Sequence, residues 1–426
     1  MDARSKELRS LLAAPNVDIL RVRHLSRLGL PDTATRAIVW PLLLGLTSAD
    51  LAEDKKALAA FTVKHNNAKG LSATFDAARL AFLDARREHE ARKVAWIAQK
   101  REEFKNSTPT EEPASEMSWP IPDEDEWVFP EPTPVHPDTP SYPTKYWDQV
   151  TKDVDRSLWK QVPDIQERTV KRDQLHRIIC AVLCTTTDFE GKQLHYFQGY
   201  HDIASVCLLT CGEDVGFSLL RRLSQTYIRD QMQERIDYVT GLLNILFPLV
   251  TSIDSNIGRF LGRSQIQPYA ALPWVMTWFS HVLENQPLSE RMFDLFLASS
   301  SWMPLYLAAA LVVYMADNGL YSCPCEFSEV HNFVSKFSSR NDIPWETLIK
   351  DALKYFVLFP PQSISSAPAL PDNAYILKYP YSWVPANEVL ARPSTISSTH
   401  IGLGLLVVGS ALALGIAVFG VPLLPK

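Results

Sequence analysis

The stretch LHYFQGYHDI at residues 194–203 decides how the rest of the chain is interpreted. It places two tyrosines, two histidines, an amide, an acid and a glycine directly before an apolar run over residues 204–210. Polar groups at the mouth of an apolar helix are either hydrogen-bonded within the fold or directed at something outside it. Gln198 is the candidate for the second role, because Gly199 beside it lets the backbone of a partner approach closely. This stretch alone leaves both interpretations open.

The composition excludes several classes of protein. With 426 residues, 46% of them hydrophobic, the chain is long enough to bury a large core. Its net charge of -6 argues against a nucleic-acid-binding protein, which usually presents a basic face. The charged N-terminus lacks the continuous apolar run of a secretory signal, so we expect a cytosolic setting with reduced cysteines.

Apolar spacing predicts helices along most of the chain, and no segment alternates convincingly as a strand does. Asp32 or Thr33 is expected to cap the helix that starts at residue 34. We therefore predict an all-α fold rather than a parallel sheet. The predicted helices cover residues 5–12, 17–28, 34–46, 145–160, 166–187, the run from the quoted stretch to 209, 215–225, 232–253, 266–282, 289–315 and 344–359.

Changes in composition divide this helical pattern. Residues 1–49 and 145–361 are expected to form one domain, interrupted by an insertion at residues 50–144 and followed by a linker at 362–400. The insertion begins with a charged helical pattern and continues with ten prolines between residues 108 and 143. Such a segment buries little surface, so we expect partial disorder. It is interpreted as a plain linker or, through Trp119, Trp127 and Phe129, as a docking peptide.

Residues 401–421 contain no charged residue. A helix of this length would span roughly 30 Å at 1.5 Å per residue, which matches the hydrocarbon core of a bilayer. Because no secretory signal precedes it, we predict a single-pass transmembrane tail anchor that holds the N-terminal part in the cytosol. The endoplasmic reticulum is the expected membrane, and the mitochondrial outer membrane is the alternative.

Motifs for other kinds of chemistry are weak. Two cysteine pairs with a spacing of four lie on predicted apolar helices, whereas structural zinc usually takes ligands from loops at shorter spacings. The sequence has no phosphate-binding P-loop. His201 and Asp202 could belong to a Ser–His–Asp hydrolase, but no Gly-x-Ser-x-Gly segment presents a nucleophile. We expect no metal site and no cofactor.

Three motifs occur in the order found in one known family. They are Arg36-x-x-x-Trp40, Val150-x-x-Asp153-x-x-Arg156 and Tyr196-x-Gln198-Gly199, with the lead-in Gly29-Leu30-Pro31 before the first. Together they resemble the TBC domain of Rab GTPase-activating proteins over about residues 28–46 and 146–359. The continuation at 200–202, the segment at 274–283 and the apolar C-terminus resemble more narrowly its tail-anchored branch. That branch acts on Rab proteins of the ER-to-Golgi route.

The resemblance implies a GTPase-activating protein whose partner is a Rab-family small GTPase in its GTP form. GTP and Mg²⁺ would be carried by the Rab, and no independent catalytic activity is expected. Arg156 would be an arginine finger that neutralises charge on the transferring phosphoryl group, and Gln198 a glutamine finger that positions the attacking water. Asp153 would hold the guanidinium of Arg156. Supporting roles are implied in the glutamine loop and in the core for Tyr196, Gly199, Arg36 and Trp40.

Two departures bear on this interpretation. Ser157 stands where the family often has threonine. A competing Arg168 follows Asp164 by four residues rather than three, and Pro163 disfavours a helix through that site, so we prefer Arg156. The alternative function is a catalytically idle scaffold that binds a Rab or organises ER membrane proteins, which the apolar tail and the proline-rich segment would suit.

Overall fold

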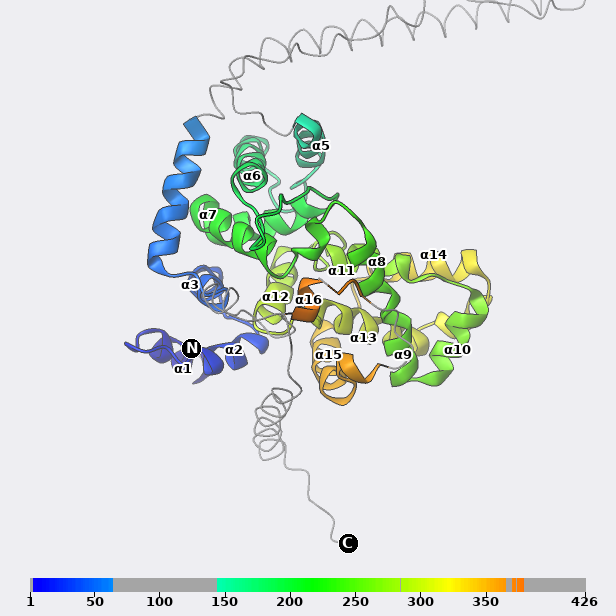
Figure 1. The fold of residues 1–426 in the computed structure, drawn as a ribbon. Coiled ribbons are helices and arrows are strands. Elements are labelled where there is room, and N and C mark those ends of the chain that lie inside the picture. Colours follow the sequence, from blue (N-terminus) through cyan, green and yellow to red (C-terminus); the bar gives the residue numbers. More distant parts are fainter. Residues whose placement is uncertain (1–2, 64–143, 284, 365–369, 373, 379–426) are drawn as a thin grey trace, which may run out of the picture. The chain divides into compact units, whose positions relative to one another are not determined.

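The computed structural model describes residues 3–63, 144–283, 285–364, 370–372 and 374–378. Within these ranges the chain forms helices and no β-strand, with one isolated antiparallel bridge between Thr187 and Gln193. The all-α prediction is thereby confirmed for this part of the chain (Figure 1). The chain divides into two units, Met1–Ser382 and Trp383–Lys426. The predicted membrane segment at 401–421 and most of the predicted insertion lie outside the described residues.

The helices follow the chain in a simple order. Before the insertion come α1 (Ala3–Leu12), α2 (Ile19–Arg27), α3 (Thr33–Leu43) and a helix over residues 48–63. After it come α5 (Thr144–Asp155), α6 (Ile165–Thr185), α7 (Tyr200–Gln225), η2 (Asp230–Met232), α8 (Asp237–Asn244), α9 (Leu246–Ile253), α10 (Ser255–Ser264), η3 (Pro268–Ala271), α11 (Leu272–Met276), α12 (Gln286–Leu297), α13 (Met303–Asp317), η4 (Leu320–Ser322), α14 (Phe327–Phe337), α15 (Trp345–Leu358), η5 (Pro361–Ser363) and α16 (Tyr375–Lys378).

Short polar side chains fix where several helices begin. Asp32 accepts a hydrogen bond from the backbone N–H of Thr35, so Asp32 rather than Thr33 caps α3. Asp164 caps α6 in the same way through the N–H of Glu167. Each cap satisfies a donor that a helix leaves without an internal partner, and both helices start one residue before the predicted positions.

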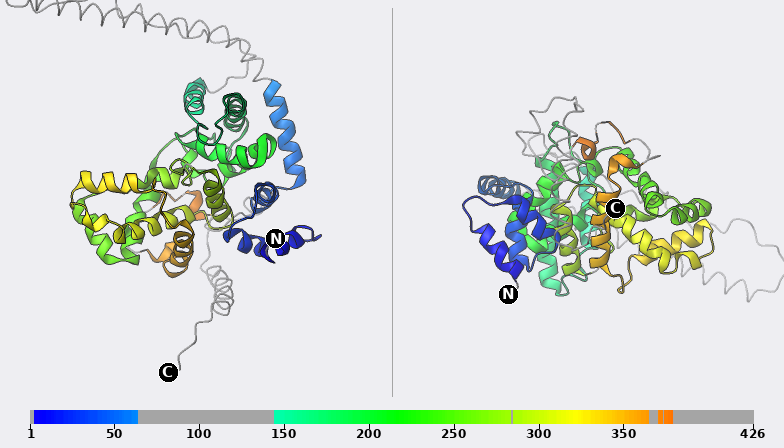
Figure 2. Two further views of the ribbon diagram at one scale, coloured as in Figure 1. Left: turned by 180° about the vertical axis from the view of Figure 1, so that it is seen from behind. Right: turned by 90° about the horizontal axis from the view of Figure 1, so that it is seen from below.

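Helix α7 packs against α3, α5, α6 and α12. It bends at Gly212, which has φ 76° and ψ 178°, between its two predicted halves. Among the described residues it is the one helix long and apolar enough to cross a membrane, but 67% of its most apolar window is buried inside the structure. That burial is what a core helix requires. In Figures 1 and 2 the helix over residues 48–63 runs beside α7, where Arg221 donates to Asp54.

Three predicted helices are broken in the structure. The segment 232–253 divides into α8 and α9, and 289–315 divides into α12 and α13. The segment 266–282 contains only η3 and α11, because Trp278 and Phe279 adopt φ values of 52° and 64°. Both rings are buried, at 2% and 0% exposure, so packing of two large aromatic side chains outweighs the local helical pattern. Helices α10 and α14 were missed by the apolar pattern.

Candidate functional site

The C-terminal end of α5 presents Arg156. The helix ends at Asp155, five residues before the predicted end, because Leu158 adopts a left-handed φ of 62°. Arg172 from α6 donates to the carbonyl oxygen of Ser157 at 3.1 and 2.6 Å and fixes the backbone beside Arg156. The Arg156 side chain itself is 57% exposed. A well-held backbone therefore carries a guanidinium that faces solvent.

Asp153 is the buried residue that joins α5 to the glutamine loop, which we define as residues 186–199. Its Oδ1 accepts from Nη2 of Arg156 at 2.5 Å, and its Oδ2 accepts from the hydroxyl of Tyr196 at 2.8 Å. Both are hydrogen bonds to an ionised acceptor, the stronger class of such bonds. The structure thus brings together Asp153, Arg156 and Tyr196, three of the predicted site residues.

Gly199 sets the end of the glutamine loop. It has φ +100°, and a Cβ atom built on it would lie 2.6 Å from Cγ2 of Thr277. Any other residue would meet both backbone strain and a steric clash. Next to it Gln198 is exposed, and its side chain has no hydrogen bond to another described residue. Its carboxamide is therefore open to a partner.

A chain of polar contacts continues from Asp153 to the surface. His201 is buried, with Nδ1 3.4 Å from the Tyr196 oxygen and Nε2 3.4 Å from Oδ1 of Asp202. Burial lowers the pKa of His201, which favours a neutral ring between the two carboxyl groups. At the outer end, Nδ1 of His281 lies 2.8 Å from Oδ2 of Asp202, and this hydrogen bond raises the pKa of His281.

His281 and Arg172 were not predicted as part of the site. His281 falls in the segment expected to be a continuous helix, and its contact with Asp202 depends on the reversal of the chain at residues 278–279. Nothing in the local spacing points to that contact. The resemblance at residues 274–283 was the one signal that drew attention to this region.

The competing arginine has a structural role. Arg168 is 5% exposed and donates to the carbonyl oxygens of Val162 and Pro163 at 3.0 and 3.1 Å. Its guanidinium also lies 3.9 Å from the ring centroid of Trp159, a cation–π contact. The carboxylate of Asp164 caps α6 and accepts neither of these two hydrogen bonds from Arg168. Arg168 therefore faces the protein, whereas Arg156 faces solvent.

Arg36 and Trp40 lie in a separate buried network. Both bind Asp294 on α12, with Nη2 of Arg36 at 2.9 Å and Nε1 of Trp40 at 2.8 Å. Arg36 also binds Glu290 at 3.0 Å, and Thr210 donates to the other oxygen of Glu290 at 3.1 Å. Thr210 lies ten residues along α7 from its start, or about 15 Å at 1.5 Å per residue. The structure does not bring Arg36 and Trp40 to the fingers, and it places them where they join α3, α7 and α12.

No group of three or more histidine, cysteine or acidic side chains in the described ranges is arranged to hold a metal ion. The six cysteines form no disulfide. Burial raises the pKa of the Cys184 thiol to about 11 and that of Cys211 to about 12, so both stay protonated at neutral pH.

Comparisons with known proteins find one family model and several similar sequences. Residues 136–320 match the family model of the Rab-GTPase-TBC domain, a range that includes both predicted fingers. TBC1 domain family member 20 of Mus musculus is 34% identical over 244 residues, which cover 57% of this chain and 59% of that protein. The Homo sapiens protein of the same name is 35% identical over 231 residues, or 54% and 56% of the two chains.

More distant matches extend the comparison. The GTPase-activating protein gyp10 of Schizosaccharomyces pombe is 28% identical over 165 residues, which cover 39% of this chain and 43% of that protein. The matched region spans less than two thirds of each of these relatives. The crystal structure of the Ypt/Rab-GAP domain of Gyp1p has the same fold, with a TM-score of 0.55 and 14% identity. That match covers 84% of this chain and 98% of that one.

Proposed function

We propose that this chain, whose residues 136–320 match the family model of the Rab-GTPase-TBC domain, accelerates GTP hydrolysis by a Rab-family small GTPase. The observation that carries the proposal is the carboxylate of Asp153, shared between Arg156 and Tyr196. It fixes the exposed guanidinium of Arg156 relative to the loop that presents Gln198. Two groups suited to an incomplete GTPase site are thereby held on one framework.

The proposed mechanism follows from the chemistry of the two exposed groups. Charge grows on the transferring phosphoryl group of GTP in the transition state, and a guanidinium supplied from outside neutralises it. The carboxamide of Gln198 can accept a hydrogen bond from the attacking water and donate another, which orients that water. Arginine fingers supplied in trans accelerate hydrolysis by about 10³ to 10⁵. Arg156 and Gln198 are proposed as the two fingers.

The partner would supply the rest of the reaction. We propose that the Rab in its GTP form carries the nucleotide and Mg²⁺, and that this chain has no cofactor and no independent catalysis. Tyr196, Gly199 and Asp153 would act as positioning residues for the fingers. Arg36 and Trp40 would act only through the core, because their contacts are made to Asp294 and Glu290.

Single-turnover GTP hydrolysis across a panel of Rab proteins tests the proposal. Arg156→Ala and Gln198→Ala should each abolish the acceleration of a Rab that the native protein stimulates. Arg340→Ala is the matched control for the first, because Arg340 is also exposed and ion-paired, to Asp342. Gln362→Ala serves the second, since Gln362 is exposed in η5. Near-native acceleration by both finger variants would overturn the mechanism.

The same experiment separates the scaffold alternative. A catalytically idle scaffold would bind a GTP-loaded Rab, measured by the change in mass or fluorescence on association, without changing its hydrolysis rate. The exposed, unbonded amide of Gln198 and the exposed guanidinium of Arg156 favour an active GTPase activator. Binding of a Rab by the native chain without any acceleration across the panel would favour the scaffold.

We further propose that the protein works on membranes of the early secretory pathway and takes part in vesicle transport. This proposal rests on the uncharged residues 401–421 as a tail anchor and on the resemblance to the tail-anchored branch. The predicted organisation has TBC-domain parts at 1–49 and 145–361, an insertion at 50–144 and a linker at 362–400, of which Ala374 and Ile376 are buried against the helical domain.

A truncation after Thr399 tests the anchor. The truncated chain should move from the carbonate-resistant membrane fraction to the soluble fraction. Each molecule should still accelerate GTP hydrolysis by a Rab as the full chain does. The double variant Val407→Arg, Val408→Arg tests the same point at full length. It should also leave the membrane fraction, because charge at the bilayer centre opposes insertion. Membrane association that persists in both would show that another segment determines location. Co-staining with ER and mitochondrial markers decides between the two membranes.

A further inference from the structure

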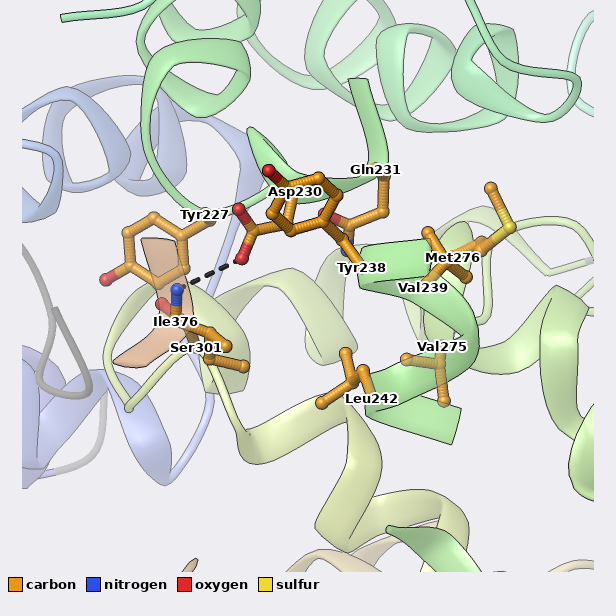
Figure 3. Close-up of a pocket in the computed structure, with 10 residues that line it drawn as sticks. All are labelled: Tyr227, Asp230, Gln231, Tyr238, Val239, Leu242, Val275, Met276, Ser301 and Ile376. Atoms are coloured by element: carbon orange, nitrogen blue, oxygen red, sulfur yellow. Dashed lines mark hydrogen bonds between the residues drawn. The ribbon is translucent and has the colours of Figure 1, made fainter. Parts of the chain in front are cut away.

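The last described helix, α16, docks on the fold beside η2. The backbone N–H groups of Tyr375 and Ile376 donate to the two carboxylate oxygens of Asp230 at 2.8 and 3.1 Å. Figure 3 shows the hydrogen bond between Ile376 and Asp230 among the residues that line a small cavity. We call the described residues 370–372 and 374–378 the C-terminal strap.

The strap is packed tightly on what it covers. Ala374 is fully buried, and Ile376 is 7% exposed. Leu370 lies against α8 so closely that a Cβ atom built on Gly241 would lie 2.9 Å from its Cδ2 atom. The cavity under Ile376 measures about 10 Å³, room for one water molecule at most. Such contact is characteristic of an integral part of a core rather than of a chain resting on a surface.

Asp230 connects the strap to the base of the glutamine loop through one buried arginine. Arg229 is 3% exposed and binds Asp230 at 3.3 Å through Nη1. Through Nε and Nη2 it also binds Oδ2 of Asp188 at 3.0 and 2.9 Å. The other oxygen of Asp188 accepts from the backbone N–H groups of Glu190 and Lys192, which closes the turn at the start of the loop.

A second connection runs through the backbone of η2. The N–H of His195 donates to the carbonyl oxygen of Met232 at 2.8 Å, and Met232 ends the same short helix that Asp230 begins. His195 precedes Gln198 by three residues. The strap is therefore linked to two parts of the glutamine loop, through Arg229 to the turn at residues 188–192 and through η2 to His195.

The energetics make this connection sensitive to the strap. The Asp230 side chain is 13% exposed, and without the two N–H groups of the strap its carboxylate would keep Arg229 as its remaining charged partner. A carboxylate that loses hydrogen-bond donors inside a protein costs free energy. We expect the Arg229 guanidinium, which Asp188 and Asp230 share, to move toward Asp230 when the strap leaves. Undocking of the strap would thereby weaken the hold of Arg229 on Asp188.

We propose that the C-terminal strap, acting through Asp230 and Arg229, is a positioning element for the loop that carries Gln198. The inference rests on the proposed function, since its consequence for activity requires that Gln198 acts on a Rab. Docking of the strap sets how rigidly the loop is held, and with it the fraction of molecules that present Gln198 correctly.

Two neighbouring residues of α16 supply a matched pair of variants. Ile376→Asp places a charge in the buried contact and should undock the strap. Leu377→Asp introduces the same charge on the exposed side, where Leu377 is 40% exposed. Hydrogen exchange is measured on the full chain in detergent micelles. We expect amides of residues 187–197 to exchange at least about tenfold faster in Ile376→Asp and to be unchanged in Leu377→Asp.

Kinetics with a responsive Rab give the second readout. Ile376→Asp should lower kcat for stimulated hydrolysis and leave KM for the Rab nearly unchanged, because a loosened Gln198 affects the transition state more than docking. Asp230→Asn keeps the shape of the side chain and removes its charge, and it should act in the same direction if Ile376→Asp fails to fold.

The outcomes separate this inference from the proposed function. Unchanged exchange of residues 187–197 in folded Ile376→Asp and Asp230→Asn overturns the positioning role, as does an equal effect of Leu377→Asp. If the native chain stimulates no Rab while the exchange difference is present, the proposed function fails and the structural coupling stands. Exchange does not depend on any Rab, so the two results are independent.

Discussion

The hydroxyl of Tyr196 donates to the carboxylate of Asp153 at 2.8 Å across 43 residues of sequence. This bond joins the glutamine loop to the end of α5, where Arg156 binds the other oxygen of the same carboxylate. The two exposed groups proposed as fingers are therefore positioned by one buried side chain. Substitution of Asp153 or Tyr196 should therefore disturb the positions of both Arg156 and Gln198.

Tyr196→Phe removes that hydrogen bond and leaves the ring in place. Because the acceptor is a buried charged group, we expect a loss of about 1.5–3 kcal/mol in the free energy of unfolding. Stimulated hydrolysis should fall as well, since Asp153 holds Arg156 less firmly. Urea denaturation measures the first effect. Tyr269→Phe is the control, because it makes the same substitution at a tyrosine that is 48% exposed. Equal stabilities of the two variants would contradict the structural role of the bond.

Gly199→Ala should be more harmful than an ordinary substitution at positive φ. A Cβ atom there meets Cγ2 of Thr277 at 2.6 Å, whereas Gly191, at φ +78°, has nothing within 4 Å. Gly191→Ala should therefore lose about 1–2 kcal/mol from backbone strain alone. Gly199→Ala should lose about 1–3 kcal/mol more through overpacking.

Thr277→Ser separates the two contributions, because it removes the clashing methyl group and keeps the hydroxyl that donates to the carbonyl oxygen of Pro273 at 2.6 Å. In the Gly199→Ala background it should restore only the part of the lost stability that is due to the clash. Thermal or urea denaturation of the native chain, Gly199→Ala, Thr277→Ser and the double variant measures this. Full recovery in the double variant would mean that φ at residue 199 can relax.

The predictable part of the site is local, and the unpredicted part is not. Asp153 and Arg156 are three residues apart, which brings them together on one helical face and makes their contact readable from spacing. Gly199 could be identified because a glycine beside a polar residue marks a special backbone position. His281 and the bond from the strap to Asp230 join segments 79 and about 145 residues apart. Such contacts depend on how the chain reverses direction, which periodicity does not encode.

His281 should make the stability of the protein depend on pH. Its hydrogen bond with Asp202 raises its pKa above the ordinary value of 6.5. A group whose pKa is higher in the folded state contributes stability that is fully present below its unfolded pKa and is lost as pH rises through the folded value. The melting temperature of His281→Gln should therefore fall further below the native value at pH 5.5 than at pH 8.5.

The exposed His331 of α14 supplies the matched control. The melting temperature of His331→Gln is measured at the same two pH values for comparison. His201 contributes in the opposite direction, since its lowered pKa favours the folded state at higher pH, and the charge of His281 is one of the smaller causes of that lowering. A difference for His281→Gln that grows with pH would contradict the bond to Asp202.

Arg36→Ala should destabilise the fold strongly and leave the site chemistry intact. It removes the cation that faces Asp294, a side chain with 0% exposure, and uncompensated buried charge costs about 3–5 kcal/mol. Burial raises the pKa of Asp294, and the hydrogen bonds from Arg36 and Trp40 offset only part of that rise. Without Arg36 that carboxyl should bind a proton more readily when folded, so the loss should be smaller at pH 5 than at pH 8.

Arg340→Ala, which breaks an exposed ion pair, should hardly change stability and gives the comparison. Acceleration of a Rab per folded molecule of Arg36→Ala should stay near native, because the Arg36 network meets α7 about 15 Å from its start at the glutamine loop. Measurements at a temperature where both variants are folded isolate this quantity. A stable Arg36→Ala chain without acceleration would instead place Arg36 among the residues that act on the partner.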